Sequence, residues 1–262
     1  METIMDIGIV GLGVVGSALR SGFEKIGQNV ITYDIKHKNT NLADLNLCDI
    51  IYICVPTPTN VDNSCDITQV TDTVKKFSNM SYSGLVCIKS TVIPGTTQKL
   101  IEQYPDLRIC FVPEFLRELS ALTDFVDNHD ILIVGTHNIE DYEKIIHCHG
   151  IIPKKSVMIQ PTAAEMTKYF SNLYNALRII FANGIYEVCE KFEINYEEVF
   201  SAISNKSNIG TDYLKCDKTY RAYGGKCLPK DALAFLKLTQ DLGLSNIKLF
   251  SAIVEDNEVY KK

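Results

Sequence analysis

Short apolar runs alternate with amphipathic stretches over roughly the first 160 residues of the chain. The runs are rich in Ile and Val and have the length of buried strands. They lie at residues 6–10, 29–33, 49–55, 85–89, 108–112, 130–134 and 157–160. Segments with helical periodicity stand between several of them, for example at 66–77 and 139–149. This alternation predicts a parallel β-sheet with crossover helices, because parallel neighbours need a connection across one face of the sheet.

The pattern changes after residue 160. Pro161 and Thr162 can begin a helix, and residues 163–192 contain no proline and only one glycine, Gly184. A long helix is therefore predicted there. Shorter helical stretches follow at 196–204, 231–241 and 246–259. We predict an α/β protein with two domains: a parallel-sheet domain over residues 1–160 and a mostly helical domain over residues 161–262.

Composition narrows the class of protein. The chain has 262 residues, with 26 Lys and Arg against 32 Asp and Glu, so its formal net charge is −6. An acidic balance argues against a nucleic-acid partner, which needs a basic face, but it permits a small anionic substrate. No stretch approaches the roughly 18 apolar residues of a membrane span. We expect no membrane partner and no signal peptide, since acids stand where a signal would carry Lys or Arg.

The nine cysteines form no CxxC pair, and their number is odd. Most lie inside apolar runs, such as Cys54 in IIYICVP and Cys110 in RICFVPE. This distribution predicts reduced, buried thiols in a cytoplasmic protein rather than a disulfide framework. A chain of this length also buries enough surface to need neither a disulfide nor a structural metal.

The segment IGIVGLGVVGSALRSGFEKIG places Gly11, Gly13 and Gly16 between a predicted strand and a predicted helix. In a Rossmann-type fold the first glycine permits the tight turn, the second lets the backbone approach a pyrophosphate, and the third lets helix and strand pack closely. Asp34 ends the next strand, 18 residues past Gly16, where an acid accepts from a ribose hydroxyl and repels a 2′-phosphate. The context predicts NAD binding. The alternative is an ordinary glycine-rich turn with a helix-capping Asp.

The string YGGKCLPKDA sets Cys227 in a glycine-rich loop immediately before a predicted helix. Helix N-terminal amides stabilise a thiolate, Pro229 suits the first turn, and Lys226 and Lys230 add positive charge. Asp231 follows one turn later. Two ordinary interpretations stay open: a small buried cysteine, and an Asp that complements the helix dipole.

Three further sets of polar residues stand in informative places. Lys168 and Asn172 share one face of the long predicted helix. They are candidate functional residues, and the alternative interpretation is a polar stripe that faces solvent. Glu114 and Glu118 follow the end of a strand, at the sheet edge where parallel sheets bind ligands. Thr91 also follows a strand, and its alternative is a simple turn or capping residue.

These motifs together resemble the UDP-glucose/GDP-mannose dehydrogenase family. The resemblance is carried, in family order and over nearly the whole chain, by GIVGLGVVG, VPTPTN, KSTVIPGT, VPEFLRE, AAEMTKYFSNLYNALR and GGKCLPKD. It implies NAD-dependent oxidation of the C6 alcohol of a nucleotide sugar to a uronate, with UDP-glucose as the first expectation. The alternatives are GDP-mannose or a UDP-N-acetylhexosamine as substrate, a two-electron reaction in which Cys227 is idle, and a truncated homologue that binds NAD without turnover.

The resemblance also implies roles for individual residues. Cys227 would be the nucleophile that attacks the aldehyde, giving a thiohemiacetal and then a thioester that water hydrolyses. Lys168 and Asn172 would stabilise the developing oxyanion. Asp231, with Thr91, would hold a water for proton transfer.

Further implied roles concern the two glutamates, the ligands and the dimer. Glu118 resembles the residue linked to thioester hydrolysis, and Glu114 lines the same substrate pocket. The resemblance implies cofactor contacts for Val15, Thr59, Thr91 and Lys230, and substrate contacts for Lys168, Asn172, Tyr213 and Gly224. It also implies a homodimer formed around the long helix, and no metal.

The sequence departs from the family pattern in four places. It ends within or just after the helix that leads into the family's third, C-terminal domain, so we expect a two-domain chain without that domain. Residues 35–48 replace a longer helical insertion. Asn208 stands where the family usually has an arginine before Ile-Gly, and Gly184 stands where it usually has Glu.

Overall fold

The computed structural model describes residues 4–117 and 120–261. The chain divides into two compact units. The first comprises Met1–Pro58 and Asp66–Lys168, and the second comprises Thr59–Cys65 and Tyr169–Lys262. The long helix α6 (Pro161–Lys191) therefore contributes its first eight residues to the first unit and the rest to the second. The loop at residues 59–65 also belongs to the second unit, although both its neighbours in sequence belong to the first.

The first unit is built on a sheet that has seven strands within the described residues, in the order β2-β1-β3-β4-β5-β6-β7. The strands are β1 (Asp6–Val10), β2 (Asn29–Tyr33), β3 (Ile50–Ile53), β4 (Leu85–Ile88), β5 (Arg108–Phe111), β6 (Leu132–Gly135) and β7 (Ser156–Ile159). Neighbours from β2 to β5 are parallel, as are β6 and β7. The exception to the predicted parallel sheet is one antiparallel pair, Phe111 with Gly135, which joins β5 to β6. An antiparallel neighbour needs no crossover helix, and only the six-residue helix α4 (Ala121–Val126) is described between these strands.

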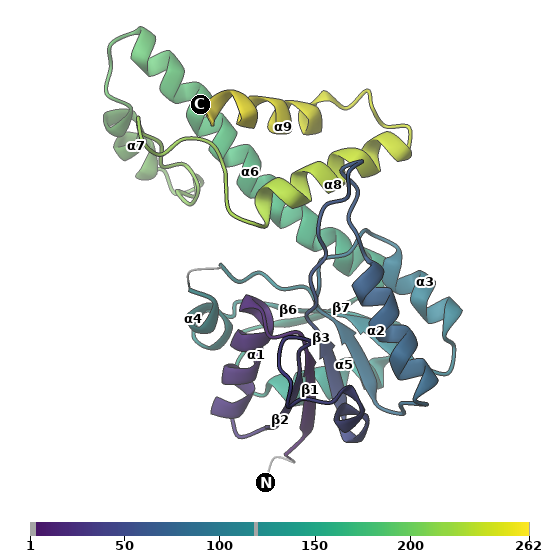
Figure 1. Ribbon diagram of the computed structural model, residues 1–262. Helices are drawn as coiled ribbons and strands as arrows, with labels where there is room; N and C mark the ends of the chain where they lie inside the picture. Colours follow the sequence, from purple (N-terminus) through teal and green to yellow (C-terminus); the bar gives the residue numbers. More distant parts are fainter. Residues whose placement is uncertain (1–3, 118–119, 262) are drawn as a thin grey trace. The chain divides into compact units, whose positions relative to one another are not determined.

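Helices cover both faces of the sheet, and Figure 1 shows α1 and α2 on opposite sides of it. One face packs on α1 (Val14–Lys25), α4 and α5 (Ile139–His149). The other packs on α2 (Thr68–Asn79), α3 (Thr96–Gln103) and the 3₁₀ helix η1 (Leu42–Leu47). In the central strands β3 and β4 every residue is apolar and buried, and successive side chains point to opposite faces of the sheet. A strand buried on both sides reads as a continuous apolar run, which is why these strands were visible in the sequence.

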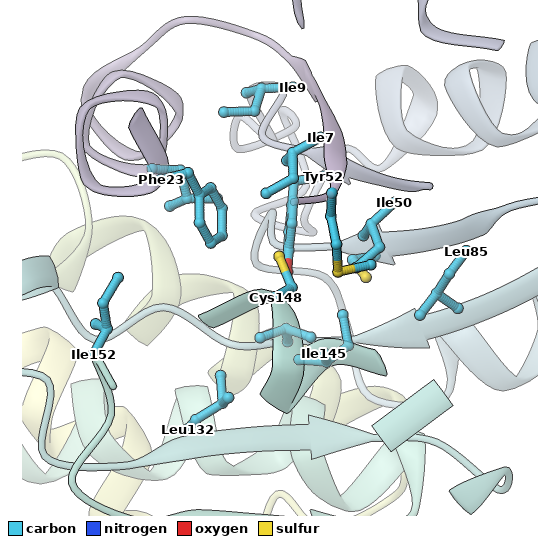
Figure 2. Close-up of a cluster of buried hydrophobic side chains, with 14 of the residues drawn as sticks. Ile7, Ile9, Phe23, Ile50, Tyr52, Leu85, Leu132, Ile145, Cys148 and Ile152 are labelled. Atoms are coloured by element: carbon cyan, nitrogen blue, oxygen red, sulfur yellow. The ribbon is translucent and has the colours of Figure 1, made fainter. Parts of the chain in front are cut away.

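The core beneath α1 and α5 is largely aromatic at its centre. Figure 2 shows Phe23, Tyr52 and Cys148 pointing toward one another from α1, β3 and α5. The Phe23 and Tyr52 ring centroids are 5.3 Å apart, and the Tyr52 hydroxyl lies 3.6 Å from the Cys148 sulfur. His149 is fully buried beside them, with its ring centroid 5.1 Å from that of Phe23. This packing fixes α1, and with it the glycine turn that precedes α1.

The second unit is helical. It contains the remainder of α6 together with α7 (Tyr196–Ser204), α8 (Leu228–Asp241) and α9 (Lys248–Tyr260). An apolar cluster that includes Tyr186 and Tyr196 packs α6 against α7. The Phe235 and Phe250 rings meet edge to face at 4.9 Å between α8 and α9, and α9 turns back along the second unit after α8 (Figure 1). The order of helices predicted after residue 160 is confirmed.

Several predicted boundaries are also confirmed, namely those of β1, β2, α5 and α7. Helix α8 begins at Leu228, three residues before the predicted start, because Pro229 occupies its first turn. Three short helices, η1, α3 and α4, were not predicted; they are six to eight residues long. Segments that short carry too few apolar repeats to show a period. Among the described helices, none combines the length and apolar character needed to cross a membrane.

Candidate active site

The glycine turn between β1 and α1 has the geometry its sequence predicts. Gly11 has φ 92°, a left-handed conformation, and a Cβ there would lie 2.8 Å from the Cys54 carbonyl oxygen. A Cβ on Gly16 would lie 1.9 Å from the Gly11 carbonyl oxygen, so only glycine lets α1 approach the strand this closely. A Cβ on Gly13 would meet no atom within 4 Å. The backbone is therefore closed at Gly11 and Gly16 and open at Gly13.

Asp34 reaches back to this turn from the end of β2. One carboxylate oxygen accepts from the Leu12 amide at 2.7 Å, and the other accepts from the Lys36 amide at 2.9 Å. These two hydrogen bonds, the Leu12 bond first, lower the pKa of Asp34. Asp34 thus stays ionised and braces the glycine turn. Each carboxylate oxygen has a further lone pair, which can accept from a ribose hydroxyl.

The turn fits the diphosphate of a dinucleotide. Gly13 is the N-cap residue of α1, and no side chain caps this helix. The first turn of α1 also carries no acidic residue. The amides at the start of α1 can therefore donate to phosphate oxygens, which the helix dipole favours. The open space at Gly13 is the place where a phosphate can approach the backbone.

A buried ion pair lies at the ends of β4 and β5. The Lys89 ammonium is 2.9 Å from one oxygen of Glu114, and both side chains are almost completely buried. The other oxygen of Glu114 accepts from the Phe115 amide at 2.8 Å and from the Leu116 amide at 3.2 Å. Burial is the largest influence and raises the pKa of Glu114, but the Lys89 charge and hydrogen bond, together with the charges of His129 and Lys168, outweigh burial, and the pKa is lowered. Glu114 is ionised and shapes the loop after β5.

Two more predicted residues lie near this sheet edge in the first unit. Thr91 follows β4, and its carbonyl oxygen accepts from the Thr57 hydroxyl at 2.8 Å. The Lys168 ammonium lies 5.6 Å from the centroid of the Phe115 ring, in the loop that Glu114 shapes. The Lys168 side chain is 9% exposed, so it is not part of a solvated polar stripe.

Glu165 anchors the start of α6 to α3, one helical turn before Lys168. Its carboxylate accepts from the Gly95 amide at 2.5 Å and from the Thr97 amide at 2.7 Å, at the N-terminus of α3. The residue is fully buried, and burial raises the pKa of Glu165. This contact fixes the helical turn that presents Lys168.

Cys227 is exposed, and the other eight cysteines, all of them within the described ranges, are buried or half-buried. Burial raises the pKa of the thiols of Cys54 and Cys148 to about 12. Cys227 is the N-cap residue of α8, and its carbonyl oxygen accepts from the Asp231 amide at 2.9 Å. The interpretation of Cys227 as a small buried cysteine is therefore wrong.

Asp231 lies in the first turn of α8 and is the centre of a polar cluster in the second unit. It is 1% exposed. One carboxylate oxygen accepts from the Asn172 amide nitrogen at 2.5 Å, and the other lies 2.6 Å from the Lys230 ammonium. Asn172 is itself buried. The long helix and the Cys227 helix are thus joined through predicted catalytic residues.

The remaining predicted residues occupy varied places. Val15 is in the first turn of α1 and packs on the core beneath that helix. Thr59 is exposed and forms an antiparallel bridge with Cys65 in the second unit. Tyr213 has φ 65°, and the Arg178 guanidinium lies 5.1 Å from its ring centroid. Gly224 is exposed, three residues before Cys227, and Glu118 lies outside the described residues.

Some residues that shape the site gave no clear signal in the sequence. Lys89 ends an apolar strand, and a lysine there is unusual enough to have suggested a buried charge. Asn183 and Asn257 hydrogen-bond to the loop that leads to Cys227. Both lie in amphipathic helices, where an asparagine ordinarily indicates a solvent-facing position. Only their burial, 1% exposed in each case, reveals the difference.

Comparison with known families agrees with both units. Residues 37–150 match the model of the UDP-glucose/GDP-mannose dehydrogenase family, NAD binding domain. Residues 162–259 match the model of the same family's central domain.

Individual relatives support the same assignment. A UDP-glucose 6-dehydrogenase from Campylobacter jejuni is 32% identical over 98% of this chain and 73% of its own length. One from Rickettsia typhi is 29% identical over 86% of this chain, but only 52% of its own length is covered. The chain thus spans about half the length of some of the curated relatives it matches. The structure of a UDP-glucose dehydrogenase from Pyrobaculum islandicum superposes with a TM-score of 0.89 and 26% identity, covering 98% of this chain and 69% of that one. The chain belongs to the UDP-glucose/GDP-mannose dehydrogenase family.

Proposed function

We propose that this chain is an NAD-dependent nucleotide-sugar 6-dehydrogenase that oxidises the C6 alcohol of UDP-glucose to the carboxylate of UDP-glucuronate. The observation that carries the proposal is the exposed Cys227 at the start of α8, one turn from the buried Asp231 that Asn172 holds. Family membership and the relatives named UDP-glucose 6-dehydrogenase support the substrate. The same chemistry on GDP-mannose or a UDP-N-acetylhexosamine is an alternative that the substrate screen below decides.

The glycine turn would hold the cofactor. The α1 amides after Gly13 donate to the diphosphate, and Asp34 accepts from the adenosine ribose, which favours NAD over NADP. Val15, Thr59, Thr91 and Lys230 are proposed as further cofactor contacts. When bound, NAD accepts one hydride in each of the two oxidation steps.

The first hydride leaves C6 of the sugar together with a proton from its hydroxyl, and an aldehyde forms. The sulfur of Cys227 then adds to the aldehyde carbon, and the aldehyde oxygen takes a proton, which gives a thiohemiacetal. Loss of the second hydride and of the hydroxyl proton gives a thioester. Water attacks that carbonyl, the carbon–sulfur bond breaks, and the uronate leaves while Cys227 recovers its proton.

Charge on the reacting oxygen needs donors that are already in place. We assign this role to the Lys168 ammonium and to the N–H of Asn172 that does not bond Asp231. Asp231, held by Asn172 and Lys230, would orient the water that moves protons, together with Thr91. Glu118 is proposed for thioester hydrolysis, and Glu114 for shaping the loop beneath the sugar. Tyr213 and Gly224 are proposed as substrate contacts.

We also propose that two copies of the chain form a homodimer through α6. Among the large apolar side chains exposed on this helix, Phe170, Tyr174, Phe181 and Val188 follow one another at spacings of four and seven residues. Residues at this spacing form one stripe along a helix, and such a stripe is typical of a surface that packs on a partner helix. A second copy of the chain is the partner that we propose.

The experiment is a screen of nucleotide sugars with NAD, followed at the nicotinamide absorbance. We expect NADH with UDP-glucose, and two NADH for each uronate. One NADH for each product would replace the thioester route by a two-electron oxidation. NAD binding measured by calorimetry without NADH from any nucleotide sugar would overturn the enzymatic proposal and leave a nucleotide-binding protein.

A further inference from the structure

The loop that leads to Cys227 has an unfavourable backbone. Ala222 has φ 59° and Gly225 has φ 74°, both in the left-handed region. For alanine this conformation costs free energy, so the surrounding contacts must hold it. Cys227 is two residues past Gly225 and is itself the N-cap residue of α8. The path of this loop therefore determines the position of the Cys227 sulfur at the start of α8.

Asn257, in the last turns of α9, holds the centre of the loop with both ends of its side-chain amide. Its Oδ1 accepts from the Tyr223 amide at 2.7 Å, and its Nδ2 donates to the Tyr223 carbonyl oxygen at 3.2 Å. Asn257 is 1% exposed and Tyr223 is 3% exposed. A buried amide that pairs with both backbone groups of one residue fixes its position and orientation as a strand neighbour does.

Asn183, on α6, holds Ala222, the residue before Tyr223. Its Oδ1 accepts from the Ala222 amide at 3.3 Å and from the Arg221 side chain at 2.6 Å. Its Nδ2 donates to the Ile179 carbonyl oxygen at 2.7 Å, which fixes the amide itself. The strained Ala222 is thus held by Asn183 on α6, and the residue after it is held by Asn257 on α9. All of these residues belong to the second unit.

We propose that Asn257 is a positioning residue for Cys227, which makes the placement of the sulfur depend on α9. The inference rests on the proposed function, in which Cys227 is the nucleophile. Loss of the amide leaves the Tyr223 N–H and carbonyl groups buried without partners. The loop then relaxes toward water, Ala222 leaves its left-handed conformation, and the sulfur loses its place at the start of α8.

The test compares three variants of the full chain. Asn257→Ala removes both bonds, and Asn257→Asp keeps the acceptor for the Tyr223 amide but places a carboxylate against the Tyr223 carbonyl oxygen. Tyr223→Phe is the matched control, because it removes the hydroxyl that donates to the Ile253 carbonyl oxygen at 3.1 Å. The control loses one hydrogen bond between the same loop and the same helix but keeps both backbone bonds. Each variant is assayed well below its own unfolding midpoint.

The first readout is alkylation of Cys227 by iodoacetamide under native conditions, with Cys227→Ser as the blank for the other thiols. Cys227 is already exposed, so access does not limit its rate. We expect both Asn257 variants to react at a rate at least about fivefold different from that of the parent, because the loop no longer holds the sulfur at the start of α8. Tyr223→Phe should react within about twofold of the parent on the same scale. Equal rates in the parent and both Asn257 variants would overturn the proposal.

The second readout is the ratio of uronate to NADH, with released aldehyde trapped by hydroxylamine. A misplaced sulfur slows the second oxidation more than the first, so Asn257→Ala should release aldehyde while its KM for NAD stays unchanged. A purely structural role predicts the same ratio in Asn257→Ala and Tyr223→Phe. The nucleophile assignment of Cys227 and the positioning role of Asn257 can be refuted separately. Undiminished uronate formation by Cys227→Ser would refute the nucleophile assignment. The alkylation rates would still decide whether Asn257 positions the sulfur.

Discussion

The glycine turn in the first unit and the Cys227 loop in the second are two functional loops that precede a helix, but they are fixed in different ways. The turn is closed by close backbone contacts: Gly16 packs on the Gly11 carbonyl, and the Ser17 amide bonds to Gly13, while Asp34 braces the turn from 22 residues away. The Cys227 region is held from afar. Asn172 bonds to Asp231 across 59 residues, and Asn257 bonds to Tyr223 across 34.

The difference teaches where each loop is vulnerable. A turn that depends on close backbone contacts fails when one atom is added at the wrong place. A loop that depends on distant amides fails when one hydrogen-bonding group is removed from another helix. Substitutions that separate steric closure from long-range anchoring should therefore affect the two units independently.

Cys227→Ser tests that independence with the largest expected effect. A serine hydroxyl is a much weaker nucleophile at neutral pH, so uronate formation should fall by more than about a thousandfold. NAD affinity should not change, because Cys227 is not among the proposed cofactor contacts and the glycine turn and Asp34 belong to the first unit. Uronate measured by chromatography and NAD binding measured by calorimetry check both parts. Undiminished uronate would refute the nucleophile assignment.

Gly16→Ala should break the first unit's loop by sterics alone. The new methyl would lie 1.9 Å from a backbone oxygen, so α1 must move away from β1. We expect NAD affinity to fall about 100-fold, or about 2.7 kcal/mol, together with a lower Tm. Gly13→Ala is the control, since its methyl meets no atom within 4 Å and should leave the Tm unchanged. Equal Tm values for parent and Gly16→Ala would contradict the steric argument.

The same difference explains what could be predicted from the sequence. The central strands β3 and β4 were predicted because both of their faces are buried. The glycine turn was predicted because its three glycines, the flanking strand and helix, and Asp34 lie within about 30 residues. These signals are local and need no knowledge of which segments meet. The motif around Cys227 was visible for the same reason, and the cysteine's exposure agrees with its prediction as a reactive group.

What could not be predicted depends on long-range pairing. Asn257 and Asn183 are single polar residues in amphipathic helices, and nothing near them in the sequence names Tyr223 or Ala222 as partners. The assignment of residues 59–65 to the second unit has the same cause. The direction of β6 was also missed, because an apolar run reads the same in a parallel and an antiparallel pair.

His149 offers a pH test confined to the first unit's core. Burial lowers the pKa of His149 to about 3, while an unfolded histidine has a pKa near 6.5. Below about pH 6.5 the unfolded chain binds a proton that the folded chain does not, so this contribution to stability is complete above that pH and declines as pH falls toward about 3. From pH 7 to pH 5 the free energy of unfolding should fall by about 2 kcal/mol.

Urea unfolding of His149→Phe against His147→Gln checks this pH dependence. His147 is exposed on the same helix, so its variant should keep the parent's pH dependence, while His149→Phe should lose most of it. Hydrogen exchange in α1 and α5 should report the acid loosening, because the Phe23 and His149 rings meet there. Identical slopes in the two variants would show that another group causes the loss.

Gly184→Ala should give the smallest effect, a gain in stability. Gly184 lies inside α6, and the nearest atom to an added Cβ is the Tyr260 hydroxyl at 3.8 Å, an ordinary contact distance. Alanine favours a helix interior by about 1 kcal/mol over glycine, so the Tm should rise by a few degrees. The Asn183 and Asn257 amides are untouched, so the uronate rate should not change.

Gly243→Ala is the matched control for that gain. This glycine follows α8, and an added Cβ would meet nothing within 4 Å, but its φ is 72°. The available space is thus similar and the backbone preference is opposite, so Gly243→Ala should lower the Tm by a comparable amount. If both variants raised the Tm, free space rather than backbone conformation would set the response. If Gly184→Ala instead slowed uronate formation, α6 would have to transmit strain to the Cys227 loop through Asn183, and the separation of stability from positioning in the second unit would not hold.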